Sequence, residues 1–333
     1  MKWILGIIDT ILAVILVYIL IYPKIQASKV VNATVLYEEG LGSLPLYVAE
    51  DQGYFDSVRV NVNLQKVMHP GEEIDKLLKG SANVAVGMNW IDFVYKSALR
   101  PQAMKVLYSM ESTIESPYTA LFYVKKRRRV YIPKKINYKR FFRRHRIRVI
   151  GCLKRAKEER LMKYMLKQLG VDTRDLEFTE IDPANLDSVI AKKSVDLIVA
   201  YEPYRSYLMK MPSKVVLIDD AFFEKNIFSP YPDALGLTSV VNLKLSKKSV
   251  VRVKEALDMA INYIRKNPDD AMKILDKNLK LPDDLVFELP KIEKYDEIEF
   301  IIYKKFIDYL KNAEIILIQI DPEVYRLARQ DIQ

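Results

Sequence analysis

Apolar and polar stretches alternate along the chain in a way that predicts short strands and helices in regular succession. Residues 58–67 alternate between apolar and polar side chains, which is typical of a half-exposed strand because strand side chains point to opposite faces. Residues 84–86 are continuously apolar and predict a buried strand after a helix. With strands at 30–37 and 104–110, the order of elements predicts right-handed βαβ units in a parallel sheet.

The stretch 70–90 has a counterpart at 183–203 that aligns with it without a gap. In both, a helix begins at a proline, passes through a lysine and a serine, and leads to an apolar strand and a loop. The second half opens in a similar way, with a strand at 146–152 and a helix at 153–169 that Gly170 ends. We therefore expect two similar α/β lobes with a ligand site between them.

The length of the chain agrees with a two-lobe organisation, since 333 residues are long for one domain and sufficient for two. We expect each lobe to be a mainly parallel sheet flanked by helices. A strand at 231–241 returns to the first lobe, and the helices after it lack intervening strands. The expected boundaries are therefore 29–124 and 222–333 for lobe I, and 125–221 for lobe II.

Ligands of parallel sheets bind beyond the carboxyl ends of the strands, so the loops after the strands form the candidate site. These loops carry the candidate ligand-binding residues Glu38, Ser43, Leu44, Asn89, Trp90, Glu111, Ser112, Lys154, Arg155, Tyr201 and Glu202.

Each of these candidates also has a purely structural interpretation. The carboxylates of Glu38, Glu39 and Glu202 could hold a cation or an amine, or they could be solvated loop residues. Lys154 and Arg155 suit a sulfonate, phosphate or carboxylate, or an exposed start of a helix.

Ser43 and Trp90 are equally open to two interpretations. Ser43 could help to bind an anion at a helix N-terminus, or only cap that helix. Trp90 could stack on a ligand, or pack in the core or at a hinge.

The net charge of +10 is concentrated in one segment. Residues 125–148 hold many lysines and arginines and no acid, so the rest of the chain is close to neutral. A general nucleic-acid surface is therefore not expected, while an exposed loop, lipid head groups or a partner protein remain possible roles for this segment.

Cysteine and histidine usage argues against metal sites and covalent catalysis. The single Cys152 excludes an internal disulfide, and His69 and His145 form no ligand pattern. Cys152 is expected to be a small core residue, because neither histidine is close to it in sequence. We expect no catalytic residue, no metal and no cofactor.

An apolar segment at 4–22 precedes the first predicted strand. Its nineteen residues would span about 28 Å as a helix, close to the thickness of a bilayer core, with Trp3 and Tyr22 at its ends. We expect residues 1–28 to be an uncleaved membrane anchor. A cleaved signal peptide is the alternative, although its apolar region is usually about 7–15 residues.

Five motifs in order resemble one known family. Residues 44–55, L-P-L-Y-V-A-E-D-Q-G-Y-F, resemble the start of the SsuA/THI5-like (NMT1-like, nitrate/sulfonate/taurine) substrate-binding proteins of ABC importers. The turn at 79–85 and the Tyr-Glu-Pro-Tyr segment within 194–204 are similar to further motifs of this family. Segments 261–271 and 320–325 also fit.

The resemblance implies a periplasmic-binding-protein type II-like fold, and an extracytoplasmic protein that binds a small organic solute. Its implied partners are the solute, an ABC permease and, through the N-terminal helix, the membrane. It further implies a monomer that is not an enzyme and binds no nucleic acid. The basic run and the loop 152–156 depart from the family pattern, which leaves the solute open.

Two other functions are consistent with the same fold. One is a membrane-anchored sensor or interaction module whose cleft is vestigial. The other is an enzyme similar to the thiamine-pyrimidine synthases, but the Cys-rich iron-binding motif on which those rely is missing from this sequence.

Overall fold

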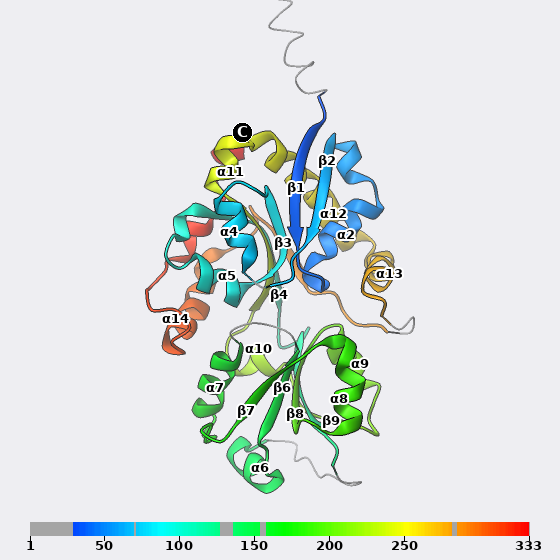
Figure 1. Ribbon diagram of the computed structural model, residues 1–333, viewed down its shortest axis with the longest axis vertical. Helices are drawn as coiled ribbons and strands as arrows, with labels where there is room; N and C mark the ends of the chain where they lie inside the picture. The colour runs from blue at the N-terminus through cyan, green and yellow to red at the C-terminus, as the bar shows by residue number, and fades with distance from the viewer. Residues whose placement is uncertain (1–28, 70, 127–135, 154–157, 282–284, 333) are drawn as a thin grey trace, which may run out of the picture.

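The computed structural model describes residues 29–69, 71–126, 136–153, 158–281 and 285–332. They form two lobes stacked along the long axis of the molecule, each built around its own sheet (Figure 1). Helices flank both sheets, which confirms the predicted two-lobe α/β architecture.

Lobe I is built on a six-stranded sheet in the order β11-β4-β10-β3-β1-β2. Its strands are β1 (Val31–Tyr37), β2 (Val60–Lys66), β3 (Val84–Asn89), β4 (Met104–Ser112), β10 (Tyr231–Ser239) and β11 (Lys291–Lys294). The strands β1, β2 and β3 are mutually parallel, whereas β10 runs antiparallel to β3 and β4. The sheet is therefore mixed, because the returning strand inserts between β3 and β4.

Lobe II has a five-stranded sheet in the order β7-β6-β8-β5-β9. Its strands are β5 (Thr119–Val124), β6 (Val149–Leu153), β7 (Glu177–Ile181), β8 (Leu197–Tyr201) and β9 (Val215–Asp220). Here too a parallel core, β7-β6-β8, is extended by an antiparallel strand, β5.

Amphipathic helices cover the sheets. Those of lobe I are α2 (Leu44–Asp51), α3 (Tyr54–Ser57), α4 (Glu72–Leu78), α5 (Trp90–Ser97), α11 (Val240–Leu245), α12 (Lys247–Lys266), α13 (Pro268–Leu279), α14 (Lys304–Asn312) and α15 (Arg329–Ile332). Those of lobe II are α6 (Tyr138–His145), α7 (Glu158–Gln168), α8 (Leu186–Lys192), α9 (Tyr204–Met209) and α10 (Phe222–Asn226). The longest, α12, buries residues spaced three and four apart, including Val250, Val253, Leu257 and Ile261, and packs on α2.

The repeat seen in the sequence is structural. In one copy α4 leads into β3, and in the other α8 leads into β8. Both strands are buried along nearly their whole length and lie inside their sheets, β3 between β1 and β10, and β8 between β6 and β5. The apolar runs therefore mark strands that are covered on both faces.

Lobe II starts earlier and ends later than the sequence suggested. The strand β5, at 119–124, was assigned to lobe I but pairs with β8 and β9. The helix α10 packs on β5 and therefore also belongs to lobe II. Five of its six residues are apolar or aromatic, and such a run carries no information on which sheet it joins, so its pairing could not be predicted from the sequence.

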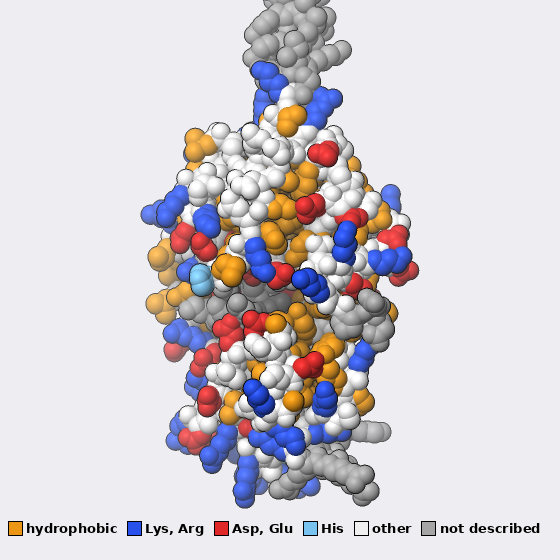
Figure 2. Space-filling model, turned by 45° about the vertical axis from the view of Figure 1, so that its right-hand side comes forward, with side chains coloured by type: hydrophobic (Ala, Val, Ile, Leu, Met, Phe, Trp, Pro, Cys, Tyr) orange, Lys and Arg blue, Asp and Glu red, His pale blue; other side chains and the backbone are white. Residues whose placement is uncertain are grey.

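The basic segment contributes the amphipathic helix α6 at the end of lobe II farthest from lobe I (Figure 1). Its Phe141 and Phe142 are buried, while Lys139, Arg143 and Arg144 are exposed. Figure 2 shows basic side chains gathered at this end of the molecule. Residues 127–135 of the same run lie outside the described residues.

No helix in the described part of the chain is both long and apolar enough to cross a membrane. The predicted anchor, residues 1–28, lies outside those residues.

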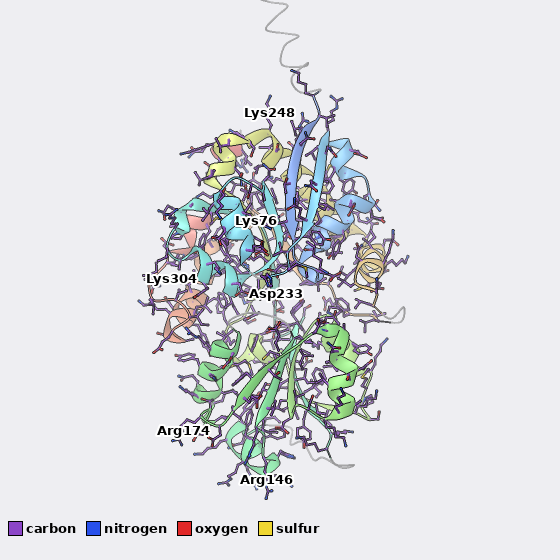
Figure 3. All side chains as sticks on the ribbon, in the orientation of Figure 1. Lys76, Arg146, Arg174, Asp233, Lys248 and Lys304 are labelled. Atoms are coloured by element: carbon purple, nitrogen blue, oxygen red, sulfur yellow. The ribbon has the colours of Figure 1, made fainter. Side chains whose placement is uncertain are left out.

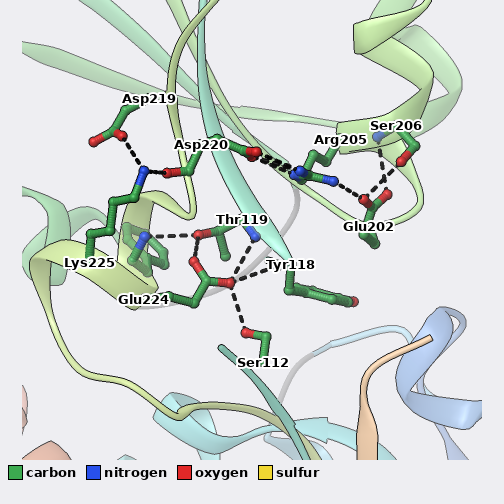
Figure 4. A network of polar contacts seen from close by, with 11 residues as sticks. Ser112, Tyr118, Thr119, Glu202, Arg205, Ser206, Asp219, Asp220, Glu224 and Lys225 are labelled. Carbon is green, nitrogen blue, oxygen red and sulfur yellow. Dashed lines mark hydrogen bonds and ion pairs between the residues drawn. The ribbon is translucent and has the colours of Figure 1, made fainter. Parts of the chain in front are cut away.

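One carboxylate joins the connections between the lobes. Glu224 Oε1 accepts hydrogen bonds from Ser112 Oγ at 2.8 Å, Tyr118 N at 2.7 Å and Thr119 N at 3.1 Å (Figure 4). Its Oε2 accepts from Thr119 Oγ1. Glu224 is in α10, at the start of the connection back to lobe I, so it ties that connection to both ends of the segment that leaves lobe I.

The site of this carboxylate is enclosed. Glu224 is 2% exposed, and burial raises the pKa of its carboxyl, while hydrogen bonds from Thr119, Tyr118 and Ser112 act in the opposite direction. Removing the acceptor would leave these buried donors unsatisfied.

We expect Glu224→Ala to lower the free energy of unfolding by about 3 kcal/mol, because several buried donors lose their acceptor. The control Glu115→Ala removes an exposed carboxylate from the same crossover segment and should change it by less than about 0.5 kcal/mol. Urea unfolding followed by circular dichroism measures both values. Equal effects of the two substitutions would contradict this role of Glu224.

Candidate functional site

A cleft of about 760 Å³ lies between the two lobes. Lobe I lines it with residues at or beyond the ends of β1, β2 and β3, with part of β10, and with residues at or beyond the end of α13. Lobe II lines it with residues at or beyond the ends of β6, β7 and β8. The carboxyl ends of the parallel strands of both sheets thus meet at one site, as the sequence predicts.

Close backbone contacts form the lobe I side of the cleft. Gly87 has a φ of +79°, and a Cβ there would meet Ser43 Oγ at 2.3 Å, so only glycine fits. The fully buried Tyr108 donates to Gly42 O at 2.8 Å and accepts from Gly87 N at 3.3 Å. These contacts fix the loop after β1 against the end of β3.

Polar residues converge on this side of the cleft. Glu38 N donates to Val86 O in β3, and Ala234, the neighbour of Asp233, pairs with Asn89. The three lining residues Glu38, Asn89 and Asp233 therefore come from adjacent strands at the same edge of the sheet. Figure 3 labels Asp233 where lobe I faces lobe II.

The amide of Asn89 has a fixed orientation. Asn89 caps α5, and its Oδ1 accepts from Ile91 N at 2.7 Å, so its Nδ2 must point the other way. Asn89 is 5% exposed and borders the cleft, and Nδ2 has no hydrogen-bond partner among the described residues. The site therefore presents a buried donor.

Lobe II contributes an aromatic wall. Tyr118, Tyr201, Tyr204 and Tyr207 all line the cleft, and the rings of Tyr118 and Tyr201 lie 6.0 Å apart. Burial first, and then the negative charges of Glu39 and Asp182, raise the pKa of Tyr204 to about 12. This phenol is therefore neutral at physiological pH and close to acidic groups from both lobes.

Glu202 lines the cleft, but its carboxylate is engaged within lobe II. Oε1 accepts from Arg205 Nη1 at 2.6 Å and from Ser206 Oγ at 2.9 Å, and Oε2 accepts from Ser206 N (Figure 4). Arg205 also forms two hydrogen bonds to Asp220, each of 2.8 Å. Burial raises the pKa of Glu202, and Arg205 and Ser206 oppose this shift. The cluster holds α9 against the ends of β8 and β9.

The structure brings four of the candidate residues predicted from the sequence into the cleft, namely Glu38, Asn89, Tyr201 and Glu202. Lys154 and Arg155 directly follow Leu153, which lines the cleft, but they lie outside the described residues.

The structure places Ser43, Leu44 and Trp90 behind the cleft. Trp90 is fully buried, donates from Nε1 to Ser109 Oγ at 3.0 Å and packs against Tyr303. Ser43 Oγ donates to Glu38 O at 2.6 Å instead of capping α2, and Leu44 is fully buried. These three residues therefore have a structural role in lobe I and do not line the cleft.

Glu111 and Ser112 belong to the end of β4, which runs on toward the crossover and does not end at the cleft. The Glu111 carboxylate pairs with Lys291 Nζ at 3.0 Å, and Ser112 donates to Glu224. Neither lines the cleft.

Asp233 was missed by the sequence analysis. It lies in the returning strand β10, whose nine residues are all buried, and a carboxylate within such an apolar run was a signal that could have been used. Asp182 caps the turn before α8 and Asp187 lies in the first turn of that helix, so both precede the strand end at which the sequence predicts the site.

The described residues contain no group of three or more His, Cys, Asp or Glu side chains placed to hold a metal ion.

Comparison with known proteins identifies one family and one fold. The family described as NMT1/THI5 like matches residues 42–271, more than half of the chain. A comparison with curated proteins by sequence gave no match.

Solved structures of binding proteins share the fold. The alkanesulfonate-binding protein SsuA from Xanthomonas axonopodis pv. citri superposes with a TM-score of 0.63 at 14% identity, covering 89% of this chain and 97% of that one. The nitrate-binding protein NrtA from Synechocystis PCC 6803 gives 0.66 at 12% identity, covering 91% and 87%. The aliphatic sulphonate binding protein SsuA from Escherichia coli gives 0.64 at 12% identity, covering 89% and 92%.

We expect Arg205→Met to destabilise the protein by about 3–5 kcal/mol, because the buried Glu202 loses its cation. The side chains of Arg205 and Glu202 are 12% and 2% exposed, whereas those of the Arg174–Asp172 pair are 85% and 59% exposed. The control Arg174→Met should therefore cost less than about 1 kcal/mol. Denaturant unfolding measures both.

Adding Glu202→Gln to Arg205→Met should recover part of the loss, because the uncompensated charge is removed. A double variant no more stable than Arg205→Met alone would contradict the role given to this pair.

Proposed function

Because this chain belongs to the NMT1/THI5-like family, we propose that it is an extracytoplasmic solute-binding protein of an ABC importer. It captures a small organic solute between its lobes and delivers it to the permease. The observation that carries this proposal is the inter-lobe cleft at the strand ends of both sheets. Its volume lies within the range of about 300–1,000 Å³ of small-molecule sites.

The connections between the lobes support a closing movement. The chain leaves lobe I after β4 and returns before β10, and both connections lie beside Glu224. Rotation about this point would change the cleft while leaving each sheet intact, as in hinge closure of two-lobed binding proteins.

Binding without catalysis is part of the proposal. The Glu202 carboxylate, which would be a natural acid or base in the cleft, is held by Arg205 and Ser206. The structurally similar proteins named above are binding proteins. Both observations favour capture of the solute over its conversion.

We further propose that residues 1–28 tether the protein to the membrane. The strand β1 enters lobe I at the end remote from lobe II (Figure 1). A tether attached there would leave the cleft accessible to solutes.

Solute binding is expected to stabilise the full-length protein by about 2.7 kcal/mol at a concentration one hundred times the Kd. The measurement is thermal unfolding against sulfonates, nitrate, pyrimidine and flavin precursors, carboxylates and amines. A solute found in this way should also reduce the radius of gyration in small-angle X-ray scattering as the lobes close.

Delivery of the solute to the permease can be measured separately from binding. The loaded protein should increase ATP hydrolysis by its ABC transporter reconstituted in vesicles, and the unloaded protein should do so less. Absence of stabilisation by every class of solute would contradict the transport proposal and favour an interaction module with a vestigial cleft.

A further inference from the structure

The edge of the lobe I sheet opposite the cleft is basic. The cleft lies at the carboxyl ends of β1, β2 and β3, so the amino ends of these strands lie at the opposite edge. The strand β10 runs antiparallel to β3, ends at that same edge and leads there into α11 and α12. We call this surface the basic edge. It consists of residues 29–32, 59–61, 79–83 and 240–252, and its basic residues are Lys29, Arg59, Lys79, Lys244, Lys247, Lys248 and Arg252.

Hydrogen bonds join the parts of the basic edge into one surface. Asn83 Nδ2 donates to Ser246 Oγ at 2.7 Å, which ties the turn before β3 to the start of α12. Arg252 Nη1, two turns into that helix, donates at 2.6 Å to each of the carbonyl oxygens of Lys29 and Arg59. The residues before β1, β2 and β3 are therefore all held beside the beginning of α12.

Positive charge on the basic edge is not balanced within the protein. Five of its basic side chains form no ion pair with any described residue, namely those of Lys29, Arg59, Lys79, Lys244 and Lys247. The four segments of the edge contain no acid, and residues 23–28, which precede them in the sequence, add Lys24 and no acid. The first acid of α12, Glu255, comes only in its third turn. Asp331 of α15 acts on Lys105 at the start of β4.

Exposed apolar side chains lie among these charges. Leu245 is 77% exposed and directly follows Lys244, and Val30 is 66% exposed and directly follows Lys29. A Cβ at Gly80 would lie 3.7 Å from Leu245 Cδ1, so Leu245 is next to the turn before β3. Basic and apolar side chains together are typical of surfaces that bind anionic bilayers, because the cations attract head groups while apolar groups enter the boundary of the acyl chains.

The described chain begins at the basic edge. The strand β1 enters lobe I at the end remote from lobe II (Figure 1), and the sequence before it contains the apolar segment 4–22. Figure 2 shows basic side chains around the point where the described chain begins, and Figure 3 labels Lys248 at the same end. A membrane tether attached here brings the basic edge, and neither the cleft nor lobe II, against the bilayer.

We propose that the basic edge of lobe I docks on the anionic head groups of the membrane. The molecule then stands with lobe I on the bilayer, lobe II outermost and the cleft open to the surrounding solution. This inference rests on the proposed tether for the proximity of the membrane, whereas the charge pattern belongs to the described residues themselves. Each Lys or Arg near an anionic surface strengthens binding by about fivefold, and the attraction acts over about 8 Å in physiological salt.

The reactivity of individual lysines tests the docking. The full chain is placed in lipid nanodiscs of phosphatidylcholine, either alone or with about one third phosphatidylglycerol, and is acetylated with acetic anhydride. Mass spectrometry should show Lys79, Lys244 and Lys247 reacting about threefold more slowly or less in the anionic discs. Sodium chloride at about 0.5 M should remove this protection, because it screens the attraction. Lys139, exposed on α6 at the opposite end of the molecule, should react equally in both lipids.

Matched triple variants connect the protection to the basic edge. Lys79→Gln, Lys244→Gln and Lys247→Gln together remove three of its charges, so the remaining Lys29 and Lys248 should lose most of their protection in the anionic discs. The control removes three charges from α6, by Lys139→Gln, Arg143→Gln and Arg144→Gln, and should leave the protection of Lys29 and Lys248 unchanged. The melting temperature of each variant checks folding.

The outcomes separate docking from the tether and from solute capture. Equal reactivity of the lysines of the basic edge in both lipids would overturn the docking and leave the other two proposals standing. Protection of Lys139 instead would place the opposite end of the molecule on the lipid and would also overturn it. Failure of the chain to be retained in neutral discs would overturn the tether. Docking then predicts flotation of the full chain with anionic vesicles at low salt, and absence of flotation would overturn it.

Discussion

The arrangement of the two lobes depends on one buried carboxylate. Glu224 receives hydrogen bonds from the last residue of β4, from the first residue of β5 and from Tyr118, which precedes β5, and it lies just before the chain returns to β10. These hydrogen bonds hold the outgoing and returning connections side by side between the two lobes. A cluster around Arg205 fixes α9, which carries part of the aromatic wall, against the ends of β8 and β9.

The sequence predicted the repeated units and the place of the site, because apolar runs such as 84–86 and 197–199 identify buried strands directly. The sequence did not predict which strands pair. The strands β5 and β10 are apolar like their neighbours, and their direction depends on contacts that are distant in sequence. The direction in which a single side chain points could not be predicted. Asn89 faces the cleft whereas Trp90, one residue later, turns into the core. A side chain's direction at a strand-to-helix junction depends on the local backbone, which composition does not determine.

Overall charge and local charge differ in this protein. The net charge of +10 invites an anionic partner, yet the exposed basic residues of α6 lie at the end of lobe II farthest from lobe I, away from the cleft. The electrostatic potential of surface charges falls off within about 8 Å in physiological salt, so each region acts on its own surroundings. Basic residues at a distant pole do not set the preference of the cleft.

The position of β10 has a consequence for the order of folding during synthesis. Lobe II is one continuous stretch between β4 and β10, so all its strands are synthesised before β10. The strands β3 and β4 of lobe I are made before it, but they are separated in the sheet by β10, which is made after it. Until then β3 has an open edge and β4 lacks both of its neighbours in the sheet, β10 and β11. Lobe II can therefore fold first, and β10, which is synthesised after it, can then pair with β3 and β4.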